Sequence, residues 1–336
     1  MNRANGNSIG NQARVALESA ARTSLYAPSV FNTQPWNWRI YGDVMELWAD
    51  RTRQLEASDP DGNLLMLSCG AILHHARVAL GAAGRAARVE RLPDPERPDL
   101  LARVRLGAAI PVSPQTLSLA DAIVHRRTDR RAFGARQVPA VILERLRLLA
   151  EQEGAGLHVV RPDQMAMLAV SADLATTAEL DDPDYQVELR YWTSRPESSG
   201  DGVPLAAAVQ PGLRRVPVRD FAPDVVGGMP AGEGRDEGAS YVVLFGVGYR
   251  PIDLLRGGEA LSALLLTATA EGLATAPLSD AVEVTWPHHL LRYLVSDLGE
   301  PYVVVRLGYV DSADPLPPVP RRAAVDVIAV HDQEQK

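Results

Sequence analysis

Residues 28–36 have the sequence PSVFNTQPW, in which two prolines enclose side chains that both donate and accept hydrogen bonds. Ser29 offers a hydroxyl, and Asn32 and Gln34 offer amides. A flat heterocycle with imide edges needs partners of this kind. The alternative interpretation is a capped turn after a helix, and a bare PSxxN pattern favours that turn. The full pattern is much rarer, and it indicates a binding loop.

The segments around this loop predict short strands and helices in alternation. Gly42-Asp43 separates two short apolar runs and is a strong hairpin signal. A long apolar run then stops at Gly84, as helices commonly do. The elements expected in the first part of the chain are a helix at 13–24, strands at 38–41 and 44–49, a helix at 64–83, and strands at 86–92 and 101–107.

The second part of the chain repeats this plan after a linker at 107–116. It predicts helices at 118–127, 139–151, 163–180, 257–272 and 287–295, with strands at 156–161, 240–248 and 302–310. NLLMLSCGAILHHARVALGAAG in the first part and GGEALSALLLTATAEGLATAP in the second are both apolar helices that stop at glycine before a strand. We interpret them as a degenerate duplication, although two unrelated helices would look similar. The expected fold class is α+β, with an N-terminal half at 1–110 and a C-terminal half at 111–336.

A second group of chemically distinctive residues is RRTDR at 126–130, followed by Arg131 and Phe133. On a helix, Arg126 and Arg130 would share one face. Two guanidinium groups and the Thr128 hydroxyl would suit a phosphate dianion. The alternative is a solvated, charged helix end, which is the commoner fate of an arginine cluster.

The segment at 181–239 interrupts the second half with many Pro, Gly and Asp residues. Loops of this length in compact proteins are usually functional lids or disordered. Tyr191, Trp192 and Phe221 indicate partial packing, so we predict a lid.

The composition restricts the possible functions. The 336 residues have a formal net charge of −8, which argues against a nucleic-acid partner. No run approaches the roughly 20 apolar residues of a membrane span, and the polar first 15 residues lack the core of a secretory signal, so we expect a cytoplasmic protein with a frayed start. The only lysine is Lys336, so any anion must be bound by arginine or backbone amides. Cys69 is expected to be a buried structural thiol.

Metal, acid–base and dinucleotide-fold alternatives find little support. We find no convincing His–Asp–Ser set and expect no catalytic side chain. Adjacent helical positions point about 100° apart, so neither His74-His75 nor His288-His289 can readily share a metal. GVGYRP at 246–251 is not a GxGxxG sequence.

Taken together, these patterns resemble the FMN-dependent nitroreductase family. RRTDR, PSVFNTQPW, ALLLTATAEGL (263–273) and RLGY (306–309) match its motifs, and the resemblance extends over about 13–330. In ordinary members both motifs lie in one short subunit of a symmetric dimer. Here the first half lacks the arginine motif and the second half lacks PSxxN. The resemblance therefore implies a nitroreductase fold in an intramolecular pseudo-dimer, similar to the Acg-like subgroup associated with mycobacterial dormancy, and a monomer more readily than an obligate dimer.

The resemblance also implies a cofactor and its site. One FMN per chain would be held by residues of both halves: Pro28, Ser29, Asn32, Gln34, Arg126, Arg127, Thr128, Arg130, Ala276, Pro277, Leu278, Arg321 and Arg322. NAD(P)H would reduce the flavin, which would then reduce a nitroaromatic or quinone in a ping-pong scheme. The alternative is a catalytically silent protein that sequesters FMN under a closed lid.

Overall fold

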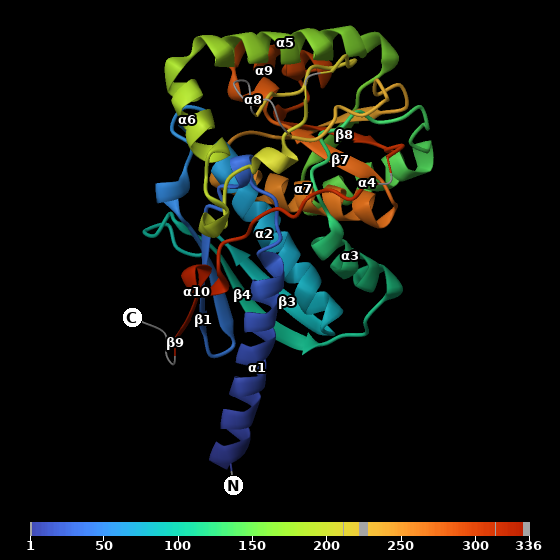
Figure 1. Ribbon diagram of the computed structural model, residues 1–336. Helices are drawn as coiled ribbons and strands as arrows, with labels where there is room; N and C mark the ends of the chain where they lie inside the picture. Colours follow the sequence, from blue (N-terminus) through green and yellow to red (C-terminus); the bar gives the residue numbers. More distant parts are fainter. Residues whose placement is uncertain (1, 211, 222–227, 313, 332–336) are drawn as a thin grey trace.

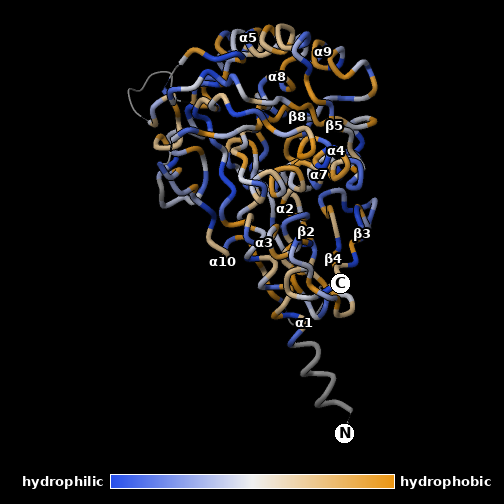
Figure 2. The backbone as a smooth tube through the Cα atoms, turned by 90° about the vertical axis from the view of Figure 1, so that its right-hand side faces the viewer, coloured by the Kyte–Doolittle hydropathy of each residue, from blue (hydrophilic) through white to orange (hydrophobic). Residues whose placement is uncertain are grey.

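The computed structural model describes residues 2–210, 212–221, 228–312 and 314–331, and it places two sheets at either end of a pair of long helices (Figure 1). This arrangement confirms the expected α+β class. Residues 211 and 222–227 of the predicted lid lie outside the described residues. Figure 2 shows apolar residues gathered around the helices between the sheets.

The N-terminal sheet has the strand order β3-β4-β2-β1-β9. The predicted hairpin is confirmed, because Tyr41 pairs with Val44 across Gly42 and Asp43. The first helix starts at Asn2, well before the predicted start near residue 13. The elements of this half are α1 (Asn2–Ser24), β1 (Trp36–Tyr41), β2 (Val44–Ala49), α2 (Asn63–Ala82), β3 (Arg85–Arg91) and β4 (Leu100–Ala109).

The C-terminal sheet has the order β5-β6-β8-β7, and all its strand pairs are antiparallel. Helix α6 lies within the predicted lid, so this segment is more regular than its composition indicates. The elements are α3 (Pro114–His125), α4 (Ala140–Glu153), β5 (Gly156–Val159), α5 (Met165–Asp181), α6 (Pro183–Thr193), β6 (Ser240–Gly246), α7 (Pro251–Ala270), β7 (Ala274–Leu278), α8 (Asp280–Glu283), α9 (Thr285–Leu294) and β8 (Glu300–Gly308).

Helices α2 and α7, the two apolar blocks of the predicted duplication, pack against each other at the centre of the molecule. Their backbones approach closely at Gly70 and Gly258, where an added Cβ would collide with the backbone of the other helix. Only glycine permits this distance. Helix α2 is apolar enough to cross a membrane by composition, but 83% of its most apolar window is buried inside the protein. Its hydropathy is that of a core helix.

Two histidines of α2 form hydrogen bonds with a serine of α7. The His74 and His75 Nδ1 atoms lie 2.7 Å and 2.8 Å from the Ser262 hydroxyl on α7. Burial lowers the pKa of both rings, so they are neutral core residues. Cys69 is also fully buried, and burial raises the pKa of its thiol, so its setting is that of a structural residue.

After β8 the chain leaves its own half and returns to the other end of the molecule (Figure 1). It forms α10 (Ala324–Val327) and then β9 (Ile328–His331), which pairs in parallel with β1. The N-terminal sheet is therefore completed by the C-terminal end of the described chain. This return path carries Arg321 and Arg322 past the 28–36 loop.

Candidate functional site

The 28–36 loop follows α1 and has an unusual backbone. Phe31, Asn32 and Gln34 have positive φ angles of 49°, 54° and 50°, a region that residues other than glycine seldom adopt. The Ser29 hydroxyl accepts a hydrogen bond of 2.9 Å from the Gln34 backbone N–H, which closes the loop on itself. Strained backbone of this kind persists only where the surroundings fix it, and it is concentrated at functional sites.

The arginine segment is extended, which corrects the prediction that it is helical. Helix α3 ends at His125, and Arg126 has a ψ angle of 126°. The Asp129 backbone N–H donates to the Thr275 carbonyl of β7 at 2.9 Å. This tertiary pairing outweighs the local helix preference, so Arg126 and Arg130 do not share a helix face.

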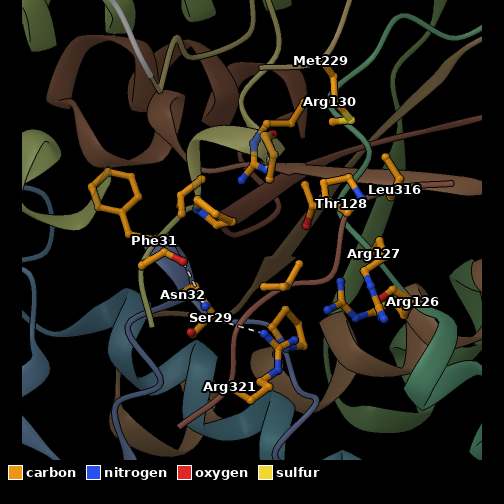
Figure 3. Close-up of a pocket in the computed structure, with 17 residues that line it drawn as sticks. Ser29, Phe31, Asn32, Arg126, Arg127, Thr128, Arg130, Met229, Leu316 and Arg321 are labelled. Carbon is orange, nitrogen blue, oxygen red and sulfur yellow. Dashed lines mark hydrogen bonds between the residues drawn. The ribbon is translucent and has the colours of Figure 1, made fainter. Parts of the chain in front are cut away.

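A cavity of about 580 Å³ lies between the loop and the arginine segment (Figure 3). The lid and the C-terminal return path complete its wall. The structure thus brings most of the predicted site residues together from both halves. The cavity is lined by Pro28, Ser29, Phe31, Asn32, Arg126, Arg127, Thr128, Arg130, Gly202, Val203, Pro204, Ala207, Met229, Leu316, Pro317, Val319 and Arg321.

Two of the lining arginines have unused hydrogen-bond donors. The Arg126 side chain is buried, and its Nε and Nη1 atoms have no hydrogen-bond partner in the described part of the chain; nor does the Nε of Arg321. Burial and the mutual repulsion of these groups lower the pKa of Arg126 to about 9, and burial with the nearby Arg127 lowers that of Arg321 to about 10. Buried cations without a counter-charge are costly, so the cavity is suited to an anion.

The neighbouring side chains occupy defined positions around these two arginines. Arg127 turns back to donate to the Val124 and Arg126 carbonyls at 2.9 and 2.8 Å. Arg130 points toward the lid, where its guanidinium lies 4.3 Å from the centre of the Phe221 ring. Thr128 lines the cavity between them.

Asn32 and Gln34 use their amides to hold other parts of the chain. The Asn32 Nδ2 donates to the Gly202 carbonyl of the lid at 3.0 Å, and its Oδ1 accepts from Arg321 at 3.1 Å. The Gln34 Nε2 donates to the Gly200 carbonyl at 2.8 Å. Gln34 does not line the cavity; its hydrogen bonds instead support the loop and the lid.

Other predicted residues lie outside the first cavity. Arg322 donates to the Gln34 carbonyl at 3.0 Å and lies 3.6 Å from Asp50, so it fastens the return path to the loop. Ala276 and Leu278 are buried in β7 and line neither cavity described here. Pro277, between them, lines the second cavity.

This second cavity, of about 650 Å³, shares Pro28, Ser29, Phe31, Thr128 and Arg130 with the first. Its remaining wall is largely apolar and comes from the 28–36 loop, α2, α7, the lid and the β7–β8 edge of the C-terminal sheet: Val30, Leu64, Leu67, Ser68, Arg219, Phe221, Leu261, Pro277, Ser279 and Val303. The two cavities together form a charged end and an apolar end. An elongated ligand with an anionic tail and a flat ring would fit this division.

The sequence did not identify most of the apolar wall, including Phe31, Arg219 and Phe221. Phe31 is a variable position in the loop pattern, and its ring packs edge-on against that of Phe221 at 5.8 Å. Arg219 is buried and donates to Glu179 at 2.5 Å and to Glu283 at 2.7 Å. The only sequence signal for Phe221 was an aromatic residue in a polar segment, and Arg219 had none.

The lid is fastened to the rest of the protein by a buried carboxylate. Asp201 accepts hydrogen bonds from Arg53, which follows β2, and from Arg195 of the lid itself. These arginines and the Ser199 hydroxyl lower the pKa of Asp201 to about 2, so it stays ionised at neutral pH. Together with the bonds from Asn32 and Gln34, this pairing fastens the predicted lid segment beside the cavities.

Among solved structures, the chain is similar to the nitroreductase NfnB of Mycobacterium smegmatis in complex with NADPH, with 16% identity and a TM-score of 0.40 over 63% of this chain and 97% of that one. A nitroreductase of Bacteroides fragilis with bound FMN has 16% identity and a TM-score of 0.39 over 61% and 95% of the two chains.

Comparison with known sequences gives the family directly, although no family model matches the chain. It is 36% identical to a Mycobacterium tuberculosis protein named "Putative NAD(P)H nitroreductase Rv3131", over 94% of this chain and 90% of that one. It is 34% identical to "Putative NAD(P)H nitroreductase acg" of the same organism, over 95% and 97%. With such identity over nearly the whole length of both chains, this protein belongs to the nitroreductase family, in the group that contains Acg.

Proposed function

We propose that this protein is an FMN-dependent oxidoreductase that takes electrons from NAD(P)H and passes them to a nitroaromatic or quinone-type acceptor. The observation that carries the proposal is that Arg126 and Arg321 each hold buried N–H groups without a partner in the described structure, and that both face a strained polar loop beside an apolar cavity. The names of the relatives, putative NAD(P)H nitroreductases, support the same chemistry.

The residues of this chain fit FMN at both ends of the paired cavities. Arg126 and Arg321 would hold the phosphate, because their free N–H groups need acceptors and two guanidinium groups match its charge. The apolar walls from α2 and α7 would take the ring. When bound, FMN supplies the two-electron chemistry. The protein's own part is to bind, orient and exclude water, so no nucleophile or general base is needed.

One FMN per chain follows from the division of the motifs. The loop comes from the N-terminal half at 1–110 and the arginine segment from the C-terminal half at 111–336. Each half has one motif where the other has none, so a single site can form between them. We propose on this ground that the chain is an internal pseudo-dimer. An acceptor and the reductant would use the same apolar space in turn, which gives ping-pong kinetics.

A second candidate is a protein that stores FMN without turnover. The bonds from Asn32, Gln34 and Arg53 to the lid favour it, because a lid held this firmly would exclude a nicotinamide ring. Both candidates share the same FMN site. They differ in whether the lid opens.

Stopped-flow absorbance tests the proposal after an FMN titration, which we expect to saturate at one FMN per chain. The FMN-loaded protein is mixed anaerobically with NADPH and then with NADH. We expect rapid bleaching of the oxidised flavin band and its return when a nitroaromatic or quinone is added. A flavin that stays oxidised with both donors but is reduced by dithionite would leave only the storage function.

Asp201→Ala should open the lid. Losing the carboxylate that pairs with two partly exposed arginines should remove about 1–2 kcal/mol, so the closing equilibrium should shift toward the open form by roughly 5- to 30-fold. Iodide should then quench the fluorescence of bound FMN faster than in the wild type. Asp173→Ala, an exposed carboxylate on α5, is the matched control and should leave quenching unchanged. Equal quenching in the two variants would show that Asp201 does not hold the lid closed.

A further inference from the structure

A third cavity, of about 600 Å³, is formed by Arg130 and by lid residues 209, 210, 212, 214 and 217–220. Three arginines line it, Arg130, Arg214 and Arg219, together with a single carboxylate, Asp220. Val209, Pro217 and Val218 add apolar surface. The excess of positive charge favours an anionic ligand.

The charge on these arginines is unevenly neutralised. Arg219 is paired with Glu179 and Glu283. The Arg214 side chain is buried, with 6% of its surface exposed, and its ion-pair contact among the described residues is a 4.0 Å approach to Asp236. Its Nη2 donates to the Ala231 carbonyl at 3.3 Å, while its Nη1 has no hydrogen-bond partner within the described ranges.

The Asp236 carboxylate, which faces the Arg214 Nη1, is already engaged by another arginine. Asp236 lies 4.0 Å from the Arg214 Nη1, but both of its oxygens accept from Arg306 at 2.8 Å. Burial and the charge of Arg306 lower the pKa of Arg214, because both disfavour its charged form. An arriving anion would relieve this repulsion and satisfy the free N–H group.

The third cavity adjoins the proposed FMN site through shared residues. Arg130 lines all three cavities, and Arg219 lines both the apolar cavity and this one. A ligand with its anionic part near Arg214 could therefore extend a flat ring into the apolar cavity once the lid shifts. The arginines proposed to hold the FMN phosphate, Arg126 and Arg321, do not line the third cavity.

We propose that the third cavity binds a phosphate of the nicotinamide dinucleotide, with Arg214 as its principal contact. This inference rests on the proposed oxidoreductase function and extends it to the place where the reductant is recognised. Arginine suits this role because its planar guanidinium donates two parallel hydrogen bonds to phosphate oxygens. The phosphate could be the diphosphate common to NADH and NADPH or the additional monoester of NADPH.

Titration calorimetry with NADP⁺ and NAD⁺ on the FMN-loaded protein tests the proposal without turnover. We expect Arg214→Met to weaken binding about tenfold or more, as the loss of a charge-assisted contact does. The matched control is Arg215→Met, which removes the same charge from an exposed neighbour that does not line the cavity. Arg214→Lys should recover part of the affinity, because lysine keeps the positive charge but cannot donate two parallel hydrogen bonds to a phosphate.

The outcomes are distinguishable. Weaker binding of NADP⁺ alone assigns Arg214 to the monoester, and weaker binding of both dinucleotides assigns it to the diphosphate. Equal affinities in Arg214→Met and Arg215→Met, or no binding of either dinucleotide to the wild type, would overturn the inference. The dissociation constant of FMN is measured first in each variant. Failure of the wild type to bind FMN would instead overturn the proposed function.

Discussion

Replacing Arg126 with alanine is expected to weaken FMN binding by about ten- to a hundredfold. The side chain is buried at the charged end of the paired cavities, and two of its nitrogens lack partners in the described structure. A charge-assisted hydrogen bond contributes about 1.5–3 kcal/mol, which corresponds to this range of affinity. The same substitution removes a repulsive neighbour of Arg321, so folding without FMN should be little harmed or even improved.

Fluorescence titration of FMN measures this effect, and chemical denaturation of the FMN-free protein measures the stability. Arg105→Ala serves as the control, since Arg105 is exposed on β4 and does not line the cavities. An FMN dissociation constant that is the same in both variants would remove Arg126 from the site. A large loss of stability in the FMN-free Arg126→Ala protein would assign the residue a structural role instead.

A large loss of stability is expected when the buried ion pair behind the arginine segment is broken. Arg306 and Asp236 are fully buried, and two Arg306 Nη1 contacts to the carboxylate measure 2.8 Å. The Arg306 Nη2 donates to the Asp129 and Arg131 carbonyls at 3.0 and 2.9 Å, which fixes the extended path of the segment. Asp236→Asn keeps the side-chain shape but leaves a buried guanidinium without its counter-charge.

We expect Asp236→Asn to lower the free energy of unfolding by about 3 kcal/mol or more, as the loss of one partner of a buried pair does. Urea denaturation of the FMN-free protein measures the change without the stabilising effect of the ligand. The control is Asp163→Asn in the exposed pair with Arg161, which should change the stability by less than about 1 kcal/mol. Similar values for both variants would mean that Asp236 does not hold the segment through its charge.

The sequence was sufficient to predict the main elements and to identify the two segments that meet at the site. Helices α2 and α7 were predictable because their apolar runs are long and stop at glycine. The meeting of the loop with the arginine segment was predictable only through the family resemblance, because each half lacks one motif. Strand β9 was missed, since four residues after an irregular stretch carry little signal of their own.

The conformation and the partners of the site residues were harder to predict. The spacing of Arg126 and Arg130 suits a helix, but backbone pairing with Thr275 holds that segment in an extended conformation. Asn32 has donors and acceptors that would suit a heterocycle, yet its amide bonds to Gly202 and Arg321. Local composition cannot distinguish these partners, because they come from parts of the chain that only the tertiary structure brings near.

The return of the chain to β1 has a consequence for the order of synthesis. Strand β1 has an unpaired edge until residues 328–331 have been made, and an open strand edge is a site of aggregation. The edge of β1 therefore stays unpaired until synthesis of the described chain is almost complete. Arg321 emerges equally late, so the anion-binding end of the site is assembled only after almost the entire described chain has been translated.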